Sequence, residues 1–170
     1  NLVTHDLGRP LHVFDADKLS GDINVRYATN SEKIAALDNK EYELSDSMVV
    51  IADQAKALGI GGIIGGEETG CLEETTNVFV ECALFDPISI AKTGRKLQVN
   101  SDARYRFERG VDPQLLFGLE ALLLRVHPQL NDPVARLRKQ GFARAAQLGL
   151  ERGLCRHVLH GPSPPVHLRS

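Results

Sequence analysis

The sequence lacks the features that mark several classes of protein. Its 170 residues include three cysteines but no C-x-x-C pair, so neither a disulfide framework nor a structural zinc site is expected. The same cysteine usage predicts a reducing compartment, the cytoplasm. No run of about 18 apolar residues occurs, which argues against a membrane-spanning helix. The formal net charge of −2 gives no overall positive field of the kind a dedicated nucleic-acid-binding protein has, so any RNA contact must be local.

The rest of the composition is that of an ordinary globular domain. Hydrophobic residues make up 42% of the chain and charged residues 25%, and the length suffices for one domain with a buried core. The chain begins at Asn1, without an initiator methionine or a signal peptide. We therefore expect it to be a piece of a longer protein.

Glycine is concentrated in the stretch GIGGIIGGEETG, Gly59–Gly70, which holds six of the fifteen glycines. Glycine permits positive φ and close approach to the backbone, so the stretch predicts a loop that a ligand touches. A Walker phosphate loop is excluded because Glu67 follows Gly66 where lysine is required. The dinucleotide fingerprint G-x-G-x-x-G is excluded because Ile64 occupies its last glycine position.

Apolar runs on both sides of the glycines predict buried strands at Met48–Asp53 and Thr76–Ala83, with Glu81 inside the second. A short strand is expected over Leu58–Ile64. Alternating or turn-flanked residues predict further strands and a hairpin. These are a strand at Leu11–Asp15, with His12 and Phe14 on one face, a strand at Ile23–Ala28, and a hairpin over Leu37–Tyr42 that turns at Asp38-Asn39.

The helices predicted after these strands are short. Pro87 ends the Glu81 strand, and Ile88–Lys92 is expected to form a single helical turn. Ser101-Asp102 offers an N-cap for a helix over Ala103–Arg109, with Gly110 as its stop. Asp112-Pro113 predicts the start of a further helix.

Two charged clusters have both an ordinary and a functional interpretation. The acidic residues Glu67, Glu68, Glu73 and Glu74 are typical of a solvated loop, while a metal site would need them to converge. The basic residues Lys92, Arg95 and Lys96 are typical of a surface, and could also meet a phosphate backbone.

Residues 126–170 differ from the rest in composition. They hold four of the six histidines and seven Arg or Lys against two acidic residues, and we expect this basic tail to be partly helical or disordered. One hypothesis is that the tail is not native family sequence, for example the product of a reading-frame shift, which resequencing would test. The alternative is a basic extension that contacts RNA.

Five segments carry a resemblance to a known family. They are GRPLHVFDADKL (Gly8–Leu19), MVVIAD (Met48–Asp53), GIIGGEETG (Gly62–Gly70), NVFVECALFDP (Asn77–Pro87) and SDARYRFERGVDP (Ser101–Pro113). In this order and spacing they resemble the B3/B4 domain of the β subunit of bacterial phenylalanyl-tRNA synthetase. The match covers about residues 1–113, and the chain follows the family poorly beyond Leu116.

The resemblance implies an α+β fold with a mixed β-sheet and flanking helices. It implies an editing domain over residues 1–125, truncated at its N-terminus, that hydrolyses tyrosine wrongly attached to tRNA(Phe). The implied partners are the 3′ end of tRNA(Phe), the synthetase α subunit and the rest of the β subunit, with no membrane. The whole synthetase is expected to use ATP and Mg²⁺, while this segment is expected to hold no cofactor and no metal.

The resemblance also assigns site residues. Glu81 matches the glutamate that accepts the tyrosine hydroxyl, Gly65 matches a pocket glycine, and Ala103 matches a small residue that limits the pocket. His12 matches the histidine that places the tRNA end and the attacking water, although a lone histidine on a strand is more often a packing residue. Ser101 stands where the family often has threonine. We expect His12 and Ser101 to be catalytic and the other three to bind substrate.

The expected chemistry is attack of water on the aminoacyl ester. No Ser-His-Asp or Cys-His arrangement is evident, so no covalent intermediate is expected. The alternative is a non-catalytic RNA-binding or structural fragment of the same subunit. Convergence of the five site residues on one cavity would favour the enzyme.

Overall fold

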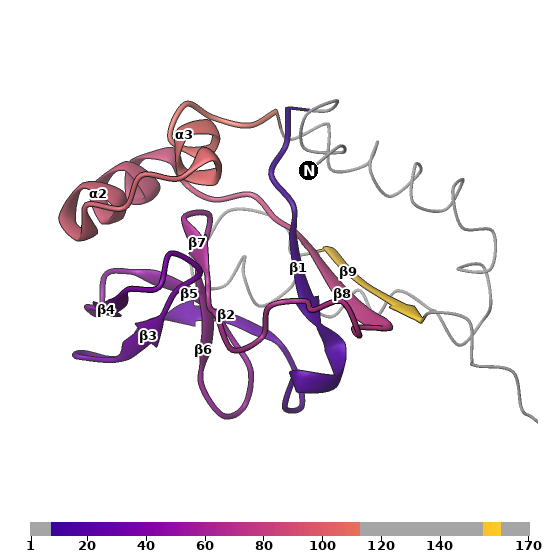
Figure 1. Cartoon of the computed structure of the whole chain (residues 1–170). Helices are drawn as coiled ribbons and strands as arrows, with labels where there is room; N and C mark the ends of the chain where they lie inside the picture. The colour runs from indigo at the N-terminus through magenta and orange to yellow at the C-terminus, as the bar shows by residue number, and fades with distance from the viewer. Residues whose placement is uncertain (1–7, 113–154, 161–170) are drawn as a thin grey trace, which may run out of the picture.

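The computed structural model describes residues 8–112 and the backbone of residues 155–160 (Figure 1). The strands are β1 (His12–Asp15), β2 (Asn24–Tyr27), β3 (Lys33–Ala35), β4 (Glu41–Glu43), β5 (Val49–Ala52), β6 (Ala57–Ile60), β7 (Ile64–Gly65), β8 (Asn77–Cys82) and β9 (Cys155–His160). The helices are the 3-10 turn η1 (Ala16–Lys18), α2 (Pro87–Leu97) and α3 (Asp102–Phe107).

The strands form three sheets, in the orders β1-β8-β9, β2-β5-β6-β7 and β3-β4. The predicted α+β class is confirmed. Where one mixed sheet was expected, every ladder between the described strands is antiparallel. Short turns join β5 to β6 and β6 to β7, and only antiparallel strands can be joined so briefly.

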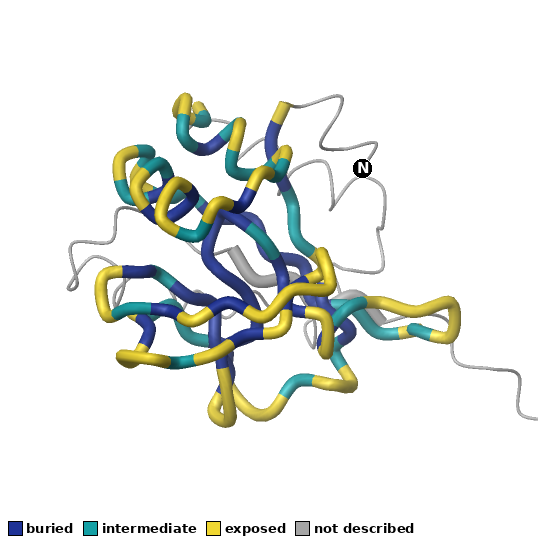
Figure 2. The backbone as a smooth tube through the Cα atoms, turned by 60° about the vertical axis from the view of Figure 1, so that its left-hand side comes forward, coloured by how far each residue is buried: buried dark blue, intermediate teal, exposed yellow. Residues whose placement is uncertain are grey.

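The sheet β2-β5-β6-β7 separates two hydrophobic cores. Along β5, Val50 and Ala52 belong to one core and Ile51 to the other, as the two-residue period of a strand requires. On β6, Leu58 and Ile60 also belong to different cores although they are two residues apart, because the register of the β5-β6 ladder shifts between Ile51 and Ala52 and breaks the regular alternation. Figure 2 accordingly shows buried backbone running through the middle of the molecule. Burial on both faces explains why Met48–Ala52 is apolar throughout rather than alternating.

The glycine stretch is itself a β-hairpin, which we name the glycine hairpin (residues 57–66). The prediction of one strand over Leu58–Ile64 was wrong, because the chain turns back at Gly62 (φ 69°). Gly59 faces Gly65 across the β6-β7 pair. A Cβ at Gly62 would lie 2.7 Å from Phe85 Cδ2 and 2.8 Å from Ile90 Cδ1, so the turn packs tightly beneath α2.

Helix α2 is longer than the single turn expected over Ile88–Lys92. Asp86 is its N-cap and accepts a hydrogen bond from Ser89 N at 2.7 Å, while Pro87 occupies the first turn, where no partner for its missing N–H is needed. The helix continues for 11 residues and ends at Gln98, which has a left-handed conformation. Pro87 therefore begins a helix as well as ending a strand.

The other local predictions are confirmed in their main features. Ser101 caps α3, and Gly110 follows that helix with φ 88°. The hairpin between β3 and β4 turns through Asn39 at φ 60°. Figure 1 shows α2 and α3 packed side by side above the glycine hairpin.

The basic tail contributes strand β9, which was not expected and which pairs with β8 from Asn77↔His160 to Cys82↔Cys155. The helix predicted after Asp112-Pro113 lies outside the described residues, as does the rest of the basic tail. In the part of the chain that the structure describes, no helix is long and apolar enough to cross a membrane.

Candidate functional site

A cavity of about 70 Å³ lies where β1 and β8 meet the glycine hairpin and α3. This volume is room for several water molecules. Four of the five predicted site residues line it: His12, Gly65, Glu81 and Ala103. The remaining walls are mainly apolar and include Leu11, Phe14, Ile51, Ile60, Ile63, Ile64, Ala83 and Phe107. An apolar pocket with a few convergent polar groups is the usual form of a ligand site.

The two polar side chains of the cavity come from one cross-strand pair. His12 on β1 lies directly opposite Glu81 on β8 in the antiparallel ladder. Side chains of such a pair project from the same face of a sheet. The register between β1 and β8 therefore delivers an imidazole and a carboxyl group to one pocket, although the two residues are far apart in the sequence.

The imidazole of His12 packs on the backbone of Gly65. A Cβ added to Gly65 would lie 2.6 Å from His12 Nε2 and even closer to Cε1. No side chain fits there without moving the imidazole. The glycine thus holds the ring of His12 against the wall of the glycine hairpin, and this contact explains why β7 carries a glycine at this position.

His12 is poorly solvated and keeps one nitrogen unused. Its Nε2 atom is buried and has no hydrogen-bond partner among the described residues. Burial lowers the pKa of His12 from 6.5 to about 4, so the ring is neutral at pH 7. The ring also meets Phe14 edge-on, with centroids 4.3 Å apart. A buried polar atom without a partner is costly, and a ligand in the cavity would satisfy it.

Glu81 is a carboxyl group in an apolar setting. The residue is 8% exposed, and no described residue donates a hydrogen bond to its side chain. Burial raises the pKa of Glu81 from 4.5 to about 7. Near neutral pH the group therefore exists in both forms, and can donate a hydrogen bond as an acid or accept one as a carboxylate.

Ser101 lies beside the cavity and does not line it. Its Oγ accepts a hydrogen bond from Arg104 N at 3.0 Å as the N-cap of α3, and donates one to the carbonyl of Ile63 in the glycine hairpin. These bonds engage the hydroxyl within the protein. Its observed function is to fix the start of α3 on the hairpin, which places Ala103 in the wall; its catalytic role stays a prediction.

Ala103 and Phe107 form the part of the wall that α3 supplies. They are four residues apart, so they lie on the same face of the helix. Phe107 is 4% exposed and meets Phe85 edge-on at 5.1 Å. The sequence analysis missed Phe107, although its spacing from Ala103 was a usable signal.

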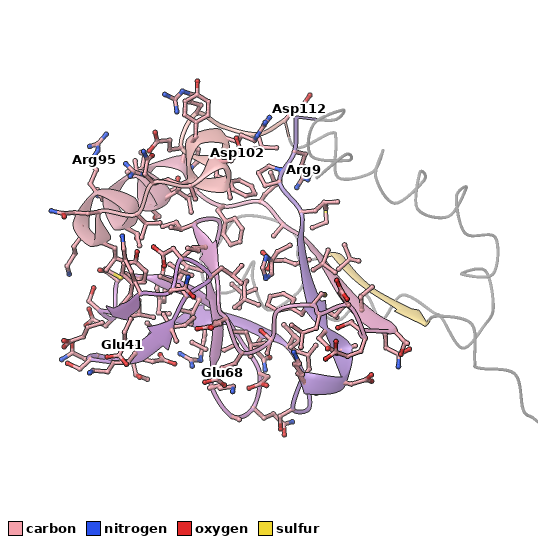
Figure 3. The ribbon with its side chains drawn as sticks, viewed as in Figure 1. Arg9, Glu41, Glu68, Arg95, Asp102 and Asp112 are labelled. Atoms are coloured by element: carbon pink, nitrogen blue, oxygen red, sulfur yellow. The ribbon has the colours of Figure 1, made fainter. Side chains whose placement is uncertain are left out.

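Arg9 is a second residue that the sequence analysis missed. Its side chain is fully buried, with Nη2 donating to Ala83 O at 2.6 Å and Nε donating to Cys82 Sγ at 3.2 Å. Figure 3 shows it where the chain enters β1, near Asp112, whose carbonyl accepts a hydrogen bond from Nη1 at 3.4 Å. Arg9 thereby ties the start of β1 to the end of β8 and supports the register of His12 and Glu81. In the sequence, Arg9 lies between a glycine and a proline, which is typical of an exposed turn residue.

The two charged clusters remain outside the cavity. Glu67, Glu68, Glu73 and Glu74 are exposed, and within residues 8–112 no group of three or more His, Cys, Asp or Glu is arranged to hold a metal ion. The basic cluster lies on the exposed side of α2. Among the described residues, the pocket is therefore the place where predicted site residues meet, and their chemical roles stay predictions.

Comparison with known proteins agrees with the resemblance seen in the sequence. The profile of a family described as "B3/4 domain" matches residues 1–123. The chain is 56% identical over 121 residues to the phenylalanine–tRNA ligase beta subunit of Ruegeria pomeroyi, a match covering 71% of this chain and 15% of that protein. For the proteins of the same name from Mesorhizobium japonicum and Brucella suis the identities are 55% and 56% over 116 residues, covering 68% of this chain and 14% of each relative. The chain thus spans about a seventh of the length of these relatives.

Proposed function

The chain belongs to the B3/4 domain family, and from this premise we propose that its pocket hydrolyses tyrosine from wrongly charged tRNA(Phe), as the editing domain of a phenylalanyl-tRNA synthetase β subunit. The observation that carries the proposal is the meeting of His12, Gly65, Glu81 and Ala103 in one cavity. The similarity to phenylalanine–tRNA ligase beta subunits supports it.

Glu81 is the residue that selects the substrate. A phenol entering an apolar pocket needs a partner for its hydroxyl, and the carboxyl group of Glu81 lacks a partner among the described residues. Binding tyrosine therefore satisfies two polar groups at once. Binding phenylalanine leaves the carboxyl group buried and unpaired, which is costly. A site built in this way can reject the analogue without the hydroxyl by about 10⁴-fold.

Small residues set the size of the space available to the substrate. Gly65 contributes no side chain, and Ala103 contributes one methyl group to the α3 side of the wall. The aromatic and aliphatic residues around them provide an apolar surface for the tyrosine ring.

His12 positions the attacking water. Its neutral ring has an unused Nε2 atom that can accept a hydrogen bond from water or from the terminal ribose of the tRNA. A base with a pKa of about 4 removes protons weakly at pH 7, so its contribution is orientation rather than strong general-base catalysis. The water oxygen bonds to the ester carbonyl carbon, the bond from that carbon to the ribose oxygen breaks, and a proton from the water passes to that ribose oxygen. Tyrosine and tRNA are then released.

Membership of a synthetase extends the proposal beyond the pocket. The partners are then the 3′ end of tRNA(Phe), the α subunit and the remainder of the β subunit. ATP and Mg²⁺ serve the activation of phenylalanine elsewhere in the whole synthetase. A cytoplasmic location follows from the same membership.

The test is deacylation of tyrosyl-tRNA(Phe) by the 170-residue chain, with phenylalanyl-tRNA(Phe) as the matched substrate. We expect loss of tyrosine and little loss of phenylalanine. His12→Ala should slow the reaction by about 100-fold, the scale of losing a positioned group. Hydrolysis of neither ester by a folded sample would contradict the proposal and favour a non-catalytic RNA-binding module.

A further inference from the structure

We infer that the outer face of α2 and α3 binds the RNA backbone and an unpaired base next to the nucleotide whose ester enters the pocket. This inference rests on the proposed function, because that function brings an RNA 3′ end to the cavity. It concerns a different surface, which we name the helical face: Lys92, Arg95, Lys96, Tyr105 and Arg109.

Charge is divided unequally between the helices and the rest of the described chain. Residues 87–110 contain six Arg or Lys and two acidic residues, a formal charge of +4. Residues 8–85 contain the same number of basic residues but fourteen acidic ones, a formal charge of −8. A polyanion approaching the pocket is therefore repelled by the sheets and attracted by the helices. Within residues 8–112, the helices are therefore the place whose charge suits the local RNA contact that the sequence predicted.

The basic residues of α2 share its exposed side. Lys92, Arg95 and Lys96 are exposed, while Ile90, Thr93 and Gly94 are buried against the fold. The side chains of Lys92 and Arg95 donate no hydrogen bond to a described residue, and Figure 3 shows Arg95 pointing away from the molecule. Lys96 reaches Ser45 Oγ at 3.0 Å. Two of the three cations are thus available to phosphate groups.

A large aromatic side chain is exposed on α3, the helix that contacts α2. Tyr105 is 55% exposed, and the guanidinium carbon of Arg109 lies 3.6 Å from the centre of its ring. An exposed tyrosine supported by an arginine is a platform on which a base stacks whatever its identity. Such a large exposed aromatic has no evident packing function.

The helical face is joined directly to the pocket. Ala103 and Phe107, from the inner side of α3, line the cavity, whereas Tyr105 on the same helix and Arg109, two residues beyond its end, are exposed. The hydroxyl of Ser101 fixes the start of α3 on the carbonyl of Ile63 in the glycine hairpin. An RNA whose last residue enters the cavity therefore comes close to α3, which borders the cavity on one side and solvent on the other.

The test measures binding of the 170-residue chain to a fluorescein-labelled RNA hairpin with a single-stranded ACCA 3′ end. Lys92→Glu combined with Arg95→Glu should weaken binding about tenfold in 0.1 M salt and reduce the dependence of log affinity on log salt by about 1.5. Tyr105→Ala should weaken binding about tenfold with little change in that dependence, and Tyr105→Phe should restore it.

The matched control is Lys33→Glu combined with Lys40→Glu, two exposed lysines of the β3-β4 hairpin. It changes the net charge by the same amount and should alter affinity less than about threefold, because these lysines lie outside the helical face and act on the RNA only through screened, longer-range charge. Lys92→Gln with Arg95→Gln repeats the test with a milder change, and thermal unfolding of each variant checks that it folds.

Several results would overturn the inference. These are absence of RNA binding by the parent chain, equal losses in the helical-face and control variants, or loss of affinity for polyglutamate instead of RNA, which would assign the face to an acidic protein. Hydrolysis of tyrosyl-tRNA with a KM unchanged by Lys92→Glu and Arg95→Glu would leave the proposed function standing and refute the inference. RNA binding through this face without hydrolysis of either ester would support the inference and contradict the proposed function.

Discussion

The pocket and the helical face handle polar groups in opposite ways. In the pocket, burial lowers the pKa of His12 and raises the pKa of Glu81, and both shifts favour the neutral form of the side chain. On α2 and α3, the charged groups stay exposed or pair with each other, as Arg106 does with Asp102 at 2.7 Å. Buried groups can therefore discriminate between substrates, whereas exposed groups attract charge and are weakened by salt.

The largest effect expected in this comparison is the loss of pocket geometry in Gly65→Ala. The new Cβ would overlap the ring of His12 and displace it. Deacylation of tyrosyl-tRNA(Phe) should fall about 100-fold, as for other small displacements of positioned groups. Affinity for the RNA hairpin should stay unchanged, because the helical face is intact.

Gly70→Ala is the control for Gly65→Ala. Its Cβ would meet Glu67 O at 3.2 Å, away from the pocket, and deacylation should change little. If both alanine variants lose activity equally, the contact between Gly65 and His12 is not what maintains the site.

A second expected effect is a pH dependence of stability. The pKa of Glu81 is raised from 4.5 to about 7, so between these pH values the folded chain holds a proton that the unfolded chain has lost. The free energy of unfolding therefore falls as the pH rises through that window. His12 has the opposite sign: its pKa is lowered from 6.5 to about 4, so the unfolded chain holds the extra proton and stability rises with pH between these values.

Glu81→Gln isolates the first of these two contributions. Relative to the parent, its free energy of unfolding should increase by about 3 kcal/mol between pH 4.5 and pH 7, as measured by urea denaturation. The exposed Glu67→Gln serves as control and should keep a constant difference from the parent. A constant difference for Glu81→Gln as well would mean that the carboxyl group is solvated in the folded chain.

The smallest expected effect concerns Ser101, at the boundary between the two regions. Ser101→Ala removes the N-cap of α3 and should lower the free energy of unfolding by about 1 kcal/mol. Ser101→Thr keeps a hydroxyl and should recover most of it. Thermal unfolding and deacylation are measured together. A loss of activity above tenfold without a loss of stability would support a catalytic hydroxyl instead of a structural one.

Sequence patterns predicted which strands and helices form better than they predicted where each one begins and ends. The strands around Val50 and Phe79 and the cap of α3 follow from apolar runs and capping residues, which act over a few positions. The glycine hairpin was mistaken for a single strand because its turn at Gly62 carries no polar turn residue. The length of α2 was underestimated because Pro87 was taken only as a strand breaker.

The site residues came from the resemblance, and their meeting could not have come from local patterns. His12 and Glu81 become neighbours through the pairing of β1 with β8, and pairing between distant strands leaves no mark in either segment. Arg9 was missed for the same reason, since its hydrogen bonds reach Cys82 and Ala83 across the fold. The pKa shifts of the pocket depend on this long-range burial as well.

The most direct test of the central claim is the ratio of the rates at which tyrosyl-tRNA(Phe) and phenylalanyl-tRNA(Phe) are hydrolysed, measured for the parent chain and for Glu81→Ala. Glu81→Ala removes the group proposed to recognise the phenol while leaving His12 and Gly65 in place. We expect the ratio to fall by about 100-fold or more, mainly through slower loss of tyrosine. A folded Glu81→Ala variant that keeps the parent's ratio would show that Glu81 does not select the substrate.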